Sequence, residues 1–363
     1  MFKAKAAPEA LHEERTIYEM AAAGGVFLAA MTLSHAMLGT GDDLHASPGL
    51  TSALLDHEQE MEAQTSDTQN SITRLTKPRL DVRYDFYSDS DGNSSDKYTS
   101  MLAAGVRNWD LAAGYKYIKA RAPALTQTAE EVFGKATRKI TDSLTIGGRI
   151  GFDRLGKEQS TFVATGQLTL DATLANSTVN LSVARDALTA TAELIDNKIR
   201  TTQGRLSLLQ PLTERLRLQG TYIYRDFSDR NHADDFQGVF QYRMYGKTPQ
   251  IDLSYGLRYL NFERQSHHGY FDPEDFFSHQ VTCTVYFEWG PAYGYLEAAF
   301  GHQSFRRNLR DNRDFFGTGI GTVGVKPTRS LLLELTAEGG NYALGTTAGF
   351  IYYALGARLG YLF

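Results

Sequence analysis

The chain has 363 residues, a formal net charge of −5 at pH 7 and a mean hydropathy of −0.35. Such a low hydropathy excludes a bundle of membrane-spanning helices, whereas a transmembrane β-barrel is compatible with it because half of each strand faces a polar lumen. The negative charge gives no general attraction to nucleic acid, so no nucleic-acid partner is expected. The single cysteine, Cys283, excludes an intrachain disulfide and a cysteine-cluster metal site.

Residues 1–77 differ in composition from the rest of the chain. Residues 20–31 form an apolar, alanine-rich run that is too short for a confident membrane helix and that follows a segment with four glutamates. We consider two interpretations: a helical or irregular N-terminal segment, such as the remnant of a helical domain, and a signal peptide whose start codon lies further downstream. Pro78 ends any helix that precedes it.

From residue 79 onward, apolar and polar residues alternate with a period of two. Leu80, Val82 and Tyr84 alternate with Asp81 and Arg83, as in a strand that is apolar on one face only. The same alternation recurs at 144–153, 161–170, 179–183, 216–225, 236–243, 251–259 and 331–336. Most of these segments have about 8–12 residues, the length of a tilted membrane strand. The pattern predicts a closed antiparallel transmembrane β-barrel, an all-β fold, over residues 78–363.

Polar gaps of two lengths separate these segments. Short gaps, such as 210–214 and 326–329, alternate with longer ones at 226–235, 261–278 and 306–314, which we expect to be loops. This asymmetry is typical of outer-membrane barrels, and about 18 residues per strand and connection predict about 16 strands, with 14 or 18 as alternatives. The competing fold is a soluble β-sandwich, which would bury its apolar stripes against a second sheet.

The last thirteen residues show the alternation most clearly. Their apolar face includes Tyr361, third from the end, and the terminal Phe363. This segment resembles the closing strand of bacterial outer-membrane barrels. The resemblance implies a Gram-negative outer membrane, contact with outer-membrane lipids, and a role for Tyr361 and Phe363 as the signal that the barrel assembly machinery recognises.

One loop carries a resemblance to a family. Its residues, a Gly-Tyr-Phe-Asp-Pro-x-x-Phe element, are Gly269, Tyr270, Phe271, Asp272, Pro273 and Phe276. Together with segments 87–93, 225–231 and 338–345, the element resembles the C-terminal barrels of exopolysaccharide export proteins, including the outer-membrane subunit of cellulose synthase. The resemblance implies a porin-like conduit for export of a polysaccharide, as in biofilm formation.

The resemblance also bears on partners. The relatives carry tetratricopeptide repeats of about 34 residues before the barrel, and residues 1–77 have no such signature. We therefore expect either a separate periplasmic helical-repeat scaffold or inner-membrane synthase as partner, or a chain that is a fragment of a longer protein.

The alternation also predicts which charged side chains face the lumen, since a charge at the lipid midplane costs about 2–4 kcal/mol. They are Arg83, Arg149, Arg205, Arg217, Arg225, Arg243, Arg258, Arg358 and Glu334. Two roles are open: an arginine-lined conduit that contacts anionic or hydroxyl-rich solutes, and a structural ladder of paired charges. Two roles are likewise open for the aromatic residues of the Gly269–Phe276 loop element: contact with a sugar, or packing that closes the end of the barrel.

Other chemistry has weak support in the sequence. His267, His268, Asp272, Asp275 and His279 cluster in sequence, but neighbouring histidines in a polar loop usually face water, so no metal or other cofactor is expected. Ser278-His279 near Asp275 suggests an outer-membrane enzyme that acts on lipid or glycan, although only geometry makes a triad. We expect no enzyme, and keep this alternative and a non-conducting structural barrel open.

Overall fold

The computed structural model describes residues 77–157, 160–266, 268–307, 310–341 and 350–363. The interpretations of residues 1–77 thus concern a segment outside the described residues, apart from Lys77.

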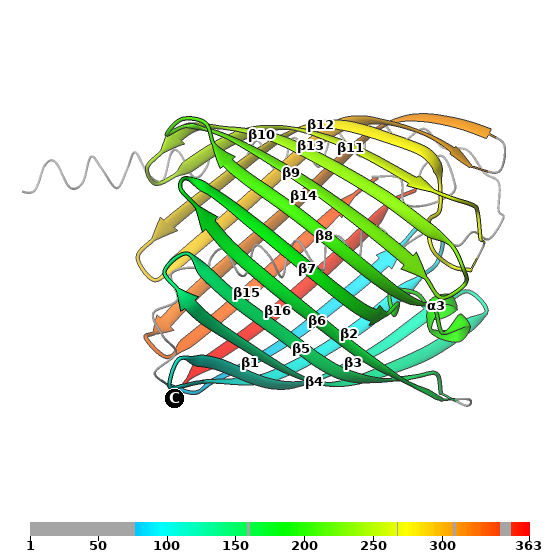
Figure 1. Cartoon of the computed structure of the whole chain (residues 1–363), viewed down its shortest axis with the longest axis horizontal. Helices are drawn as coiled ribbons and strands as arrows, with labels where there is room; N and C mark the ends of the chain where they lie inside the picture. The colour runs from blue at the N-terminus through cyan, green and yellow to red at the C-terminus, as the bar shows by residue number, and fades with distance from the viewer. Residues whose placement is uncertain (1–76, 158–159, 267, 308–309, 342–349) are drawn as a thin grey trace, which may run out of the picture.

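The described residues form one closed antiparallel barrel of 16 strands (Figure 1). The strands are β1 (Arg79–Asp89), β2 (Ser94–Val106), β3 (Trp109–Ala122), β4 (Leu125–Thr141), β5 (Leu144–Leu155), β6 (Thr161–Leu174), β7 (Ser177–Ala187), β8 (Arg200–Pro211), β9 (Leu216–Phe227), β10 (His232–Gly246), β11 (Gln250–Phe262), β12 (Glu274–Trp289), β13 (Ala292–Arg307), β14 (Arg310–Thr328), β15 (Leu331–Gly340) and β16 (Tyr352–Leu362). The predicted fold and strand number are confirmed.

The first and last strands close the barrel. They pair from Arg79 opposite Leu362 to Asp89 opposite Tyr352, so neither strand leaves an open edge. Across this seam Arg358 binds Asp81, with its Nε 3.0 Å from Oδ1 and its Nη2 2.7 Å from Oδ2. Closure matters because an unpaired backbone group in hydrocarbon costs several kcal/mol.

Apolar side chains cover the outside of the barrel. Phe162, Leu168 and Ile150 are 74%, 71% and 70% exposed, as expected for side chains whose solvent is lipid. In the last strand Leu355 and Tyr361 also point outward, and Phe363 after it is exposed. The structure thus places the alternating stripe on the outer face, whereas a β-sandwich would bury it.

Several strands are longer than their apolar segments. We expected loops at residues 226–235 and 306–314, but most of these residues lie in strands. β9 ends at Phe227 and β10 begins at His232; β13 ends at Arg307 and β14 begins at Arg310. The loop expected at 261–278 shrinks to 263–273. At these strand ends the outward residues are polar, such as Asp226 and Asp234, whereas inward residues such as Phe227 are apolar and buried. The apolar-out, polar-in alternation that marks a membrane strand is therefore reversed there, although the ladder continues.

The two ends of the barrel differ. At the turn end, where β1 begins and β16 ends, connections have two to four residues. The other end, the loop end, carries the longer connections, including 188–199 and 263–273. Connection 188–199 contains α3 (Ala192–Asn197), which Figure 1 shows at the end opposite the C-terminus. The helical residues described include no stretch that is long and apolar enough to cross a membrane.

Adjacent residues of β6 test which face meets lipid. Leu168 points outward, whereas Thr169 points inward over Gly147. We expect Leu168→Arg to lower the free energy of unfolding in lipid vesicles by about 2–4 kcal/mol, and Thr169→Arg by less than about 1 kcal/mol, because only the first places a charge in hydrocarbon. Urea unfolding of the refolded barrel measures both. Equal losses would contradict the assignment of faces.

Candidate functional site

Two connections pack against the inner wall at the loop end and form a plug, which we define as α3 together with residues 263–266 and 268–273. The helix begins after Thr191, whose side chain accepts a hydrogen bond from the Leu194 amide at 3.2 Å, and ends at Lys198 in the left-handed conformation. Its side chains Leu194 and Ile195 are fully buried. A helix this short is marginal alone, so tertiary packing must hold it in place.

The helix packs against two different parts of the inner wall. Ile195 belongs to an apolar cluster with residues of β3–β6, namely Ile118, Ala120, Ala129, Leu155 and Val163. Leu194 belongs to a second cluster on the β9–β13 side, with Phe227, Ala233, Leu260, Phe262 and Phe305. The plug therefore fixes these two stretches of the wall to each other across the loop end.

The aromatic residues of the predicted loop form the second half of the plug. Tyr270, Phe271 and Phe276 are almost completely buried, and Phe276 lies in β12. The Tyr270 ring stacks on Phe227 with centroids 4.7 Å apart, and Phe271 meets Phe305 edge to face at 5.3 Å. Since their faces are already covered, these rings pack the plug in this structure.

The non-aromatic residues of the Gly269–Phe276 element each have a structural role in the plug. Gly269 has φ +97°, and a Cβ there would lie 2.9 Å from the Glu193 Cβ, so only glycine lets the loop approach α3. Asp272 is fully buried and binds Arg307, with Oδ1 3.3 Å from Nη2. Pro273 accepts a backbone hydrogen bond from Phe262 at 3.3 Å.

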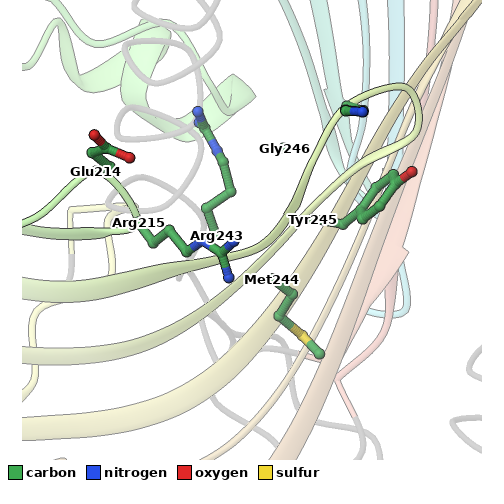
Figure 2. Close-up of a pocket in the computed structure, with 7 residues that line it drawn as sticks. Glu214, Arg215, Arg243, Met244, Tyr245 and Gly246 are labelled. Carbon is green, nitrogen blue, oxygen red and sulfur yellow. The ribbon is translucent and has the colours of Figure 1, made fainter.

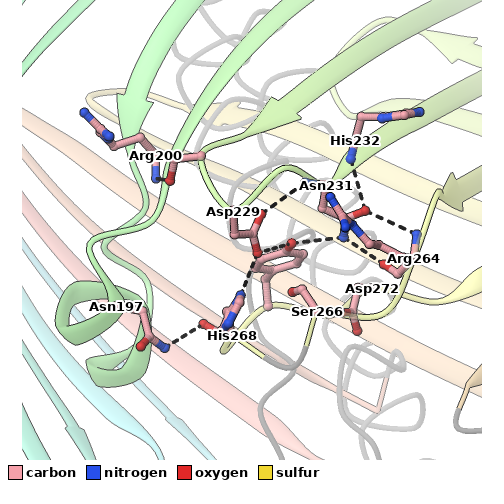
Figure 3. A network of polar contacts seen from close by, with 11 residues as sticks. Asn197, Arg200, Asp229, Asn231, His232, Arg264, Ser266, His268 and Asp272 are labelled. Carbon is pink, nitrogen blue, oxygen red and sulfur yellow. Dashed lines mark hydrogen bonds and ion pairs between the residues drawn. The ribbon is translucent and has the colours of Figure 1, made fainter.

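A polar network joins the plug loop to the β9–β10 turn (Figure 3). The Asn231 amide is fully buried; its Nδ2 donates to the Arg264 carbonyl at 2.8 Å and to Tyr270 Oη at 3.0 Å. Tyr270 Oη in turn donates to Asp229 Oδ2 at 2.8 Å, and His268 Nδ1 lies 2.8 Å from the same oxygen. Burial raises the pKa of the Asp229 carboxyl, but these hydrogen bonds outweigh it and hold the pKa below its usual value.

All the predicted lumen residues lie on the inner face, and most are paired. Arg83 binds Asp85, Arg149 binds Glu131 and Asp186, Arg225 and Arg258 bind Asp235, Arg243 binds Asp252, Arg358 binds Asp81, and Glu334 accepts from Tyr293. For these residues the arrangement is that of a structural ladder of paired charges.

Two arginines differ. Arg205 donates to Ser207 Oγ at 3.3 Å, and neither Arg205 nor Arg217 has a carboxylate partner among the residues that the structure describes. Both lie on the inner face, Arg205 opposite Ile223 and Arg217 opposite Gln241. Their guanidinium groups are therefore the ones best placed to contact a solute.

Sequence reasoning missed two buried carboxylates. Glu131 binds Lys116 Nζ at 2.9 Å and also Arg149, and lies in β4, where no alternation was recognised. Asp235 is fully buried between Arg225 at 3.0 Å and Arg258 at 2.7 Å, in a segment expected to be a loop. The usable signal was parity: Asp235 is an even number of residues from Arg243, which the alternation predicted to face the lumen.

The inner face of β12–β16 has a different chemistry. Its tyrosine hydroxyls donate to carboxylates: Tyr286 to Glu288, Tyr293 to Glu334, Tyr295 to Glu297 and Tyr352 to Glu338. Tyr293 lies over Gly324, where a Cβ would meet its ring. Aromatic faces beside hydroxyl and carboxylate groups are suited to contacts with sugar rings and their hydroxyls.

The residues that suggested other chemistry do not converge. Ser278 is buried on the inner face, whereas His279 lies on the outer face beside His302, with ring centroids 5.8 Å apart. Asp275 binds Arg306 at 3.2 Å. These positions overturn the Ser278–His279–Asp275 arrangement, because adjacent strand residues point to opposite faces. In the described part of the chain, no group of three or more His, Cys, Asp or Glu residues could hold a metal ion.

Comparison with known proteins shows the fold. No family model matches the sequence, and no curated protein sequence matches it. A solved structure described as a bacterial polysaccharide outer membrane secretin is similar with a TM-score of 0.66 and 11% identity, over 80% of this chain and 99% of that chain. OccK3 (OpdO) of Pseudomonas aeruginosa (TM-score 0.45, 13% identity, 82% and 98% covered) and a BenF-like porin of Pseudomonas fluorescens Pf-5 (0.46, 11%, 79% and 98%) are also similar. The fold is that of bacterial outer-membrane barrels.

Asn231 tests how the plug is held. We expect Asn231→Asp to speed tryptic cleavage after Arg264 about tenfold, because the carboxylate cannot donate to the Arg264 carbonyl or to Tyr270, and a lost buried hydrogen bond costs about 1–3 kcal/mol. Cleavage is followed by mass spectrometry on the folded barrel. The matched control Asn176→Asp, in an exposed turn at the turn end, should leave the rate unchanged. Unchanged cleavage in Asn231→Asp would mean that packing alone holds the loop.

Proposed function

We propose that this protein is an outer-membrane channel of a Gram-negative bacterium and that it serves as a porin-like conduit for export of a polysaccharide. The observation that carries the proposal is the inner wall, which is polar below the plug. Residues of β8–β11 supply amides and hydroxyls there, namely Gln203, Ser207, Thr221, Gln237, Gln241 and Ser254. These groups both donate and accept, as the hydroxyls of a sugar chain require.

The tyrosine–carboxylate pairs of β12–β16 support the same substrate class. Sugar rings have apolar faces that pack on aromatic rings, and hydroxyl edges that bind carboxylates. A passive conduit needs contacts that are weak and repeated, so that a polymer binds well enough to enter and loosely enough to move on. The spread of such groups over several strands is compatible with this requirement, whereas a single tight pocket would not be.

The structural comparison supports the proposal at the level of the fold. The similar structure described as a polysaccharide outer membrane secretin spans nearly the whole barrel of this chain. The loop element Gly269–Phe276 adds the sequence resemblance to exopolysaccharide export barrels. Energy for export would come from elsewhere, and the proposed partners are a periplasmic helical-repeat scaffold or an inner-membrane synthase.

Membrane assembly forms part of the same proposal. Tyr361 and Phe363 end the outward stripe of the last strand and are 41% and 57% exposed on the outside of the barrel. We propose that the barrel assembly machinery recognises them before closure and that they contact lipid afterwards. No catalytic role is proposed, because Ser278 and His279 face opposite sides of the wall.

Planar-bilayer recordings test the conduit against a non-conducting barrel. We expect small, discrete single-channel currents from the native chain. Tyr270→Ala should increase the conductance about twofold or more and make it noisier, because the ring fills the plug against Phe227. The control Tyr98→Ala, at a half-exposed residue of the outer face, should behave like the native chain. If neither the native chain nor Tyr270→Ala passed current at any voltage, the proposed conduit would be wrong.

A further inference from the structure

The turn end of the barrel contains a basic hollow between the β8–β9 and β10–β11 turns (Figure 2). Its volume is about 390 Å³, and its lining residues are Glu214, Arg215, Arg243, Met244, Tyr245, Gly246 and Lys247. Three cations and one carboxylate line it. Arg243 Nε binds Asp252 at 3.1 Å, whereas the described residues provide no ion-pair partner for Arg215 or Lys247. The hollow thus has an excess of positive charge.

A row of arginines continues from this hollow along the inner face of four neighbouring strands. This arginine ladder consists of Arg217, Arg243, Arg205, Arg258 and Arg225, in order from the turn end to the loop end. Its last two members bind Asp235 next to Ala233 and Leu260, which belong to the cluster under the plug. The ladder therefore runs from the turn end to the base of the plug.

The charges of this wall do not cancel. From residue 200 to residue 262, all of which the structure describes, the inner face and the turns of the hollow hold seven cations and three carboxylates: Arg205, Arg215, Arg217, Arg225, Arg243, Lys247 and Arg258 against Glu214, Asp235 and Asp252. Like charges in one wall repel one another and destabilise the compact state. A purely structural ladder would pair them, as the wall does for Arg243 and Arg258.

From these observations we infer that the exported polymer is a polyanion, a polysaccharide with carboxylate or other acidic substituents. The hollow receives the polymer, and the excess positive charge of the arginine ladder, with Arg205 and Arg217 as its contacting members, leads it toward the plug. This inference rests on the proposed function and narrows its substrate class. The guanidinium group has a planar fork of donors that fits carboxylates with two parallel hydrogen bonds. A neutral glucan would need the amides and hydroxyls of this wall, but would gain nothing from its excess charge.

The neighbouring wall supports the orientation of such a polymer. On β12–β16 the carboxylates Glu297 and Glu338 accept hydrogen bonds from tyrosines. Sugar faces can pack on these tyrosines, while acidic substituents meet the excess of cations on β8–β11. The direction follows from the placement of the hollow, because the short turns of outer-membrane barrels face the periplasm.

The inference is tested by current block with two probes of equal length, an oligogalacturonate and a malto-oligosaccharide. The native channel should be anion-selective, and oligogalacturonate added at the turn end should block it at concentrations at least about tenfold lower than the neutral sugar requires. In the double variant Arg205→Gln/Arg217→Gln, block by oligogalacturonate should need about tenfold more probe, whereas block by the malto-oligosaccharide should be unchanged. The double variant Arg215→Gln/Lys247→Gln should slow the onset of block by oligogalacturonate. Salt at 1 M should weaken the block by oligogalacturonate in all forms of the channel.

The control is Arg329→Gln, in an exposed turn at the same end, on a part of the rim that does not border the hollow. It should keep the native selectivity and block. If the channel conducts but the two probes block equally, or if the double variant keeps the native preference, the polyanion inference is wrong and the conduit stands. If no form conducts, the proposed function itself fails.

Discussion

The rest of this structure depends on the backbone hydrogen bonds between β1 and β16. In an open sheet the two edge strands would leave backbone N–H and C=O groups unpaired in hydrocarbon, at a cost of several kcal/mol for each group. Pairing the first strand with the last removes that cost over the whole length of both strands, from Arg79–Leu362 to Asp89–Tyr352. Once the sheet is closed, each residue has only two environments, lipid and lumen, and parity along the strand decides between them.

The lumen then needs its own interactions, because closure encloses charges in a narrow space. Buried carboxylates such as Asp235 and Glu131 each bind two cations from neighbouring strands. Removing one partner of such a set leaves an uncompensated charge, so these groups fix the relative position of the strands that carry them. Arg205 and Arg217 have no carboxylate partner within the described part of the chain. This difference between the two kinds of arginine separates the structural role of the inner wall from its proposed contact with a solute.

The plug makes the two ends of the barrel unequal. Apolar packing holds α3 between two stretches of wall, and Asn231 and Asp229 hold the loop that covers it. The turn end, by contrast, contains a hollow with excess positive charge. In the proposed function, a polymer that reaches the turn end meets attractive contacts first and the plug last. This order suits a passive conduit in which a partner supplies the driving force.

The sequence by itself determined the barrel, its approximate strand number and the faces of its strands. A period of two is a local property of one strand, and a charged side chain on the lipid face is energetically costly. The environment of residues such as Leu168 and Arg258 can therefore be read from the sequence without any tertiary information. Family resemblance likewise drew attention to Gly269 and Tyr270, although not to the reason for them. The strand ends were missed because the alternation reverses outside the membrane, where outward residues such as Asp226 and Asp234 are polar and inward residues such as Phe227 pack under the plug.

Only the tertiary structure decided which charges pair and what the loop does. Asp235 binds Arg225 and Arg258 because β9, β10 and β11 pair side by side in one register. The sequence of a single strand does not contain this register. The short helix α3 has no periodic signal, since its stability comes from side chains of distant strands that meet it across the lumen. Pairing and plugging are contacts between segments far apart in the chain, whereas alternation lies within one segment.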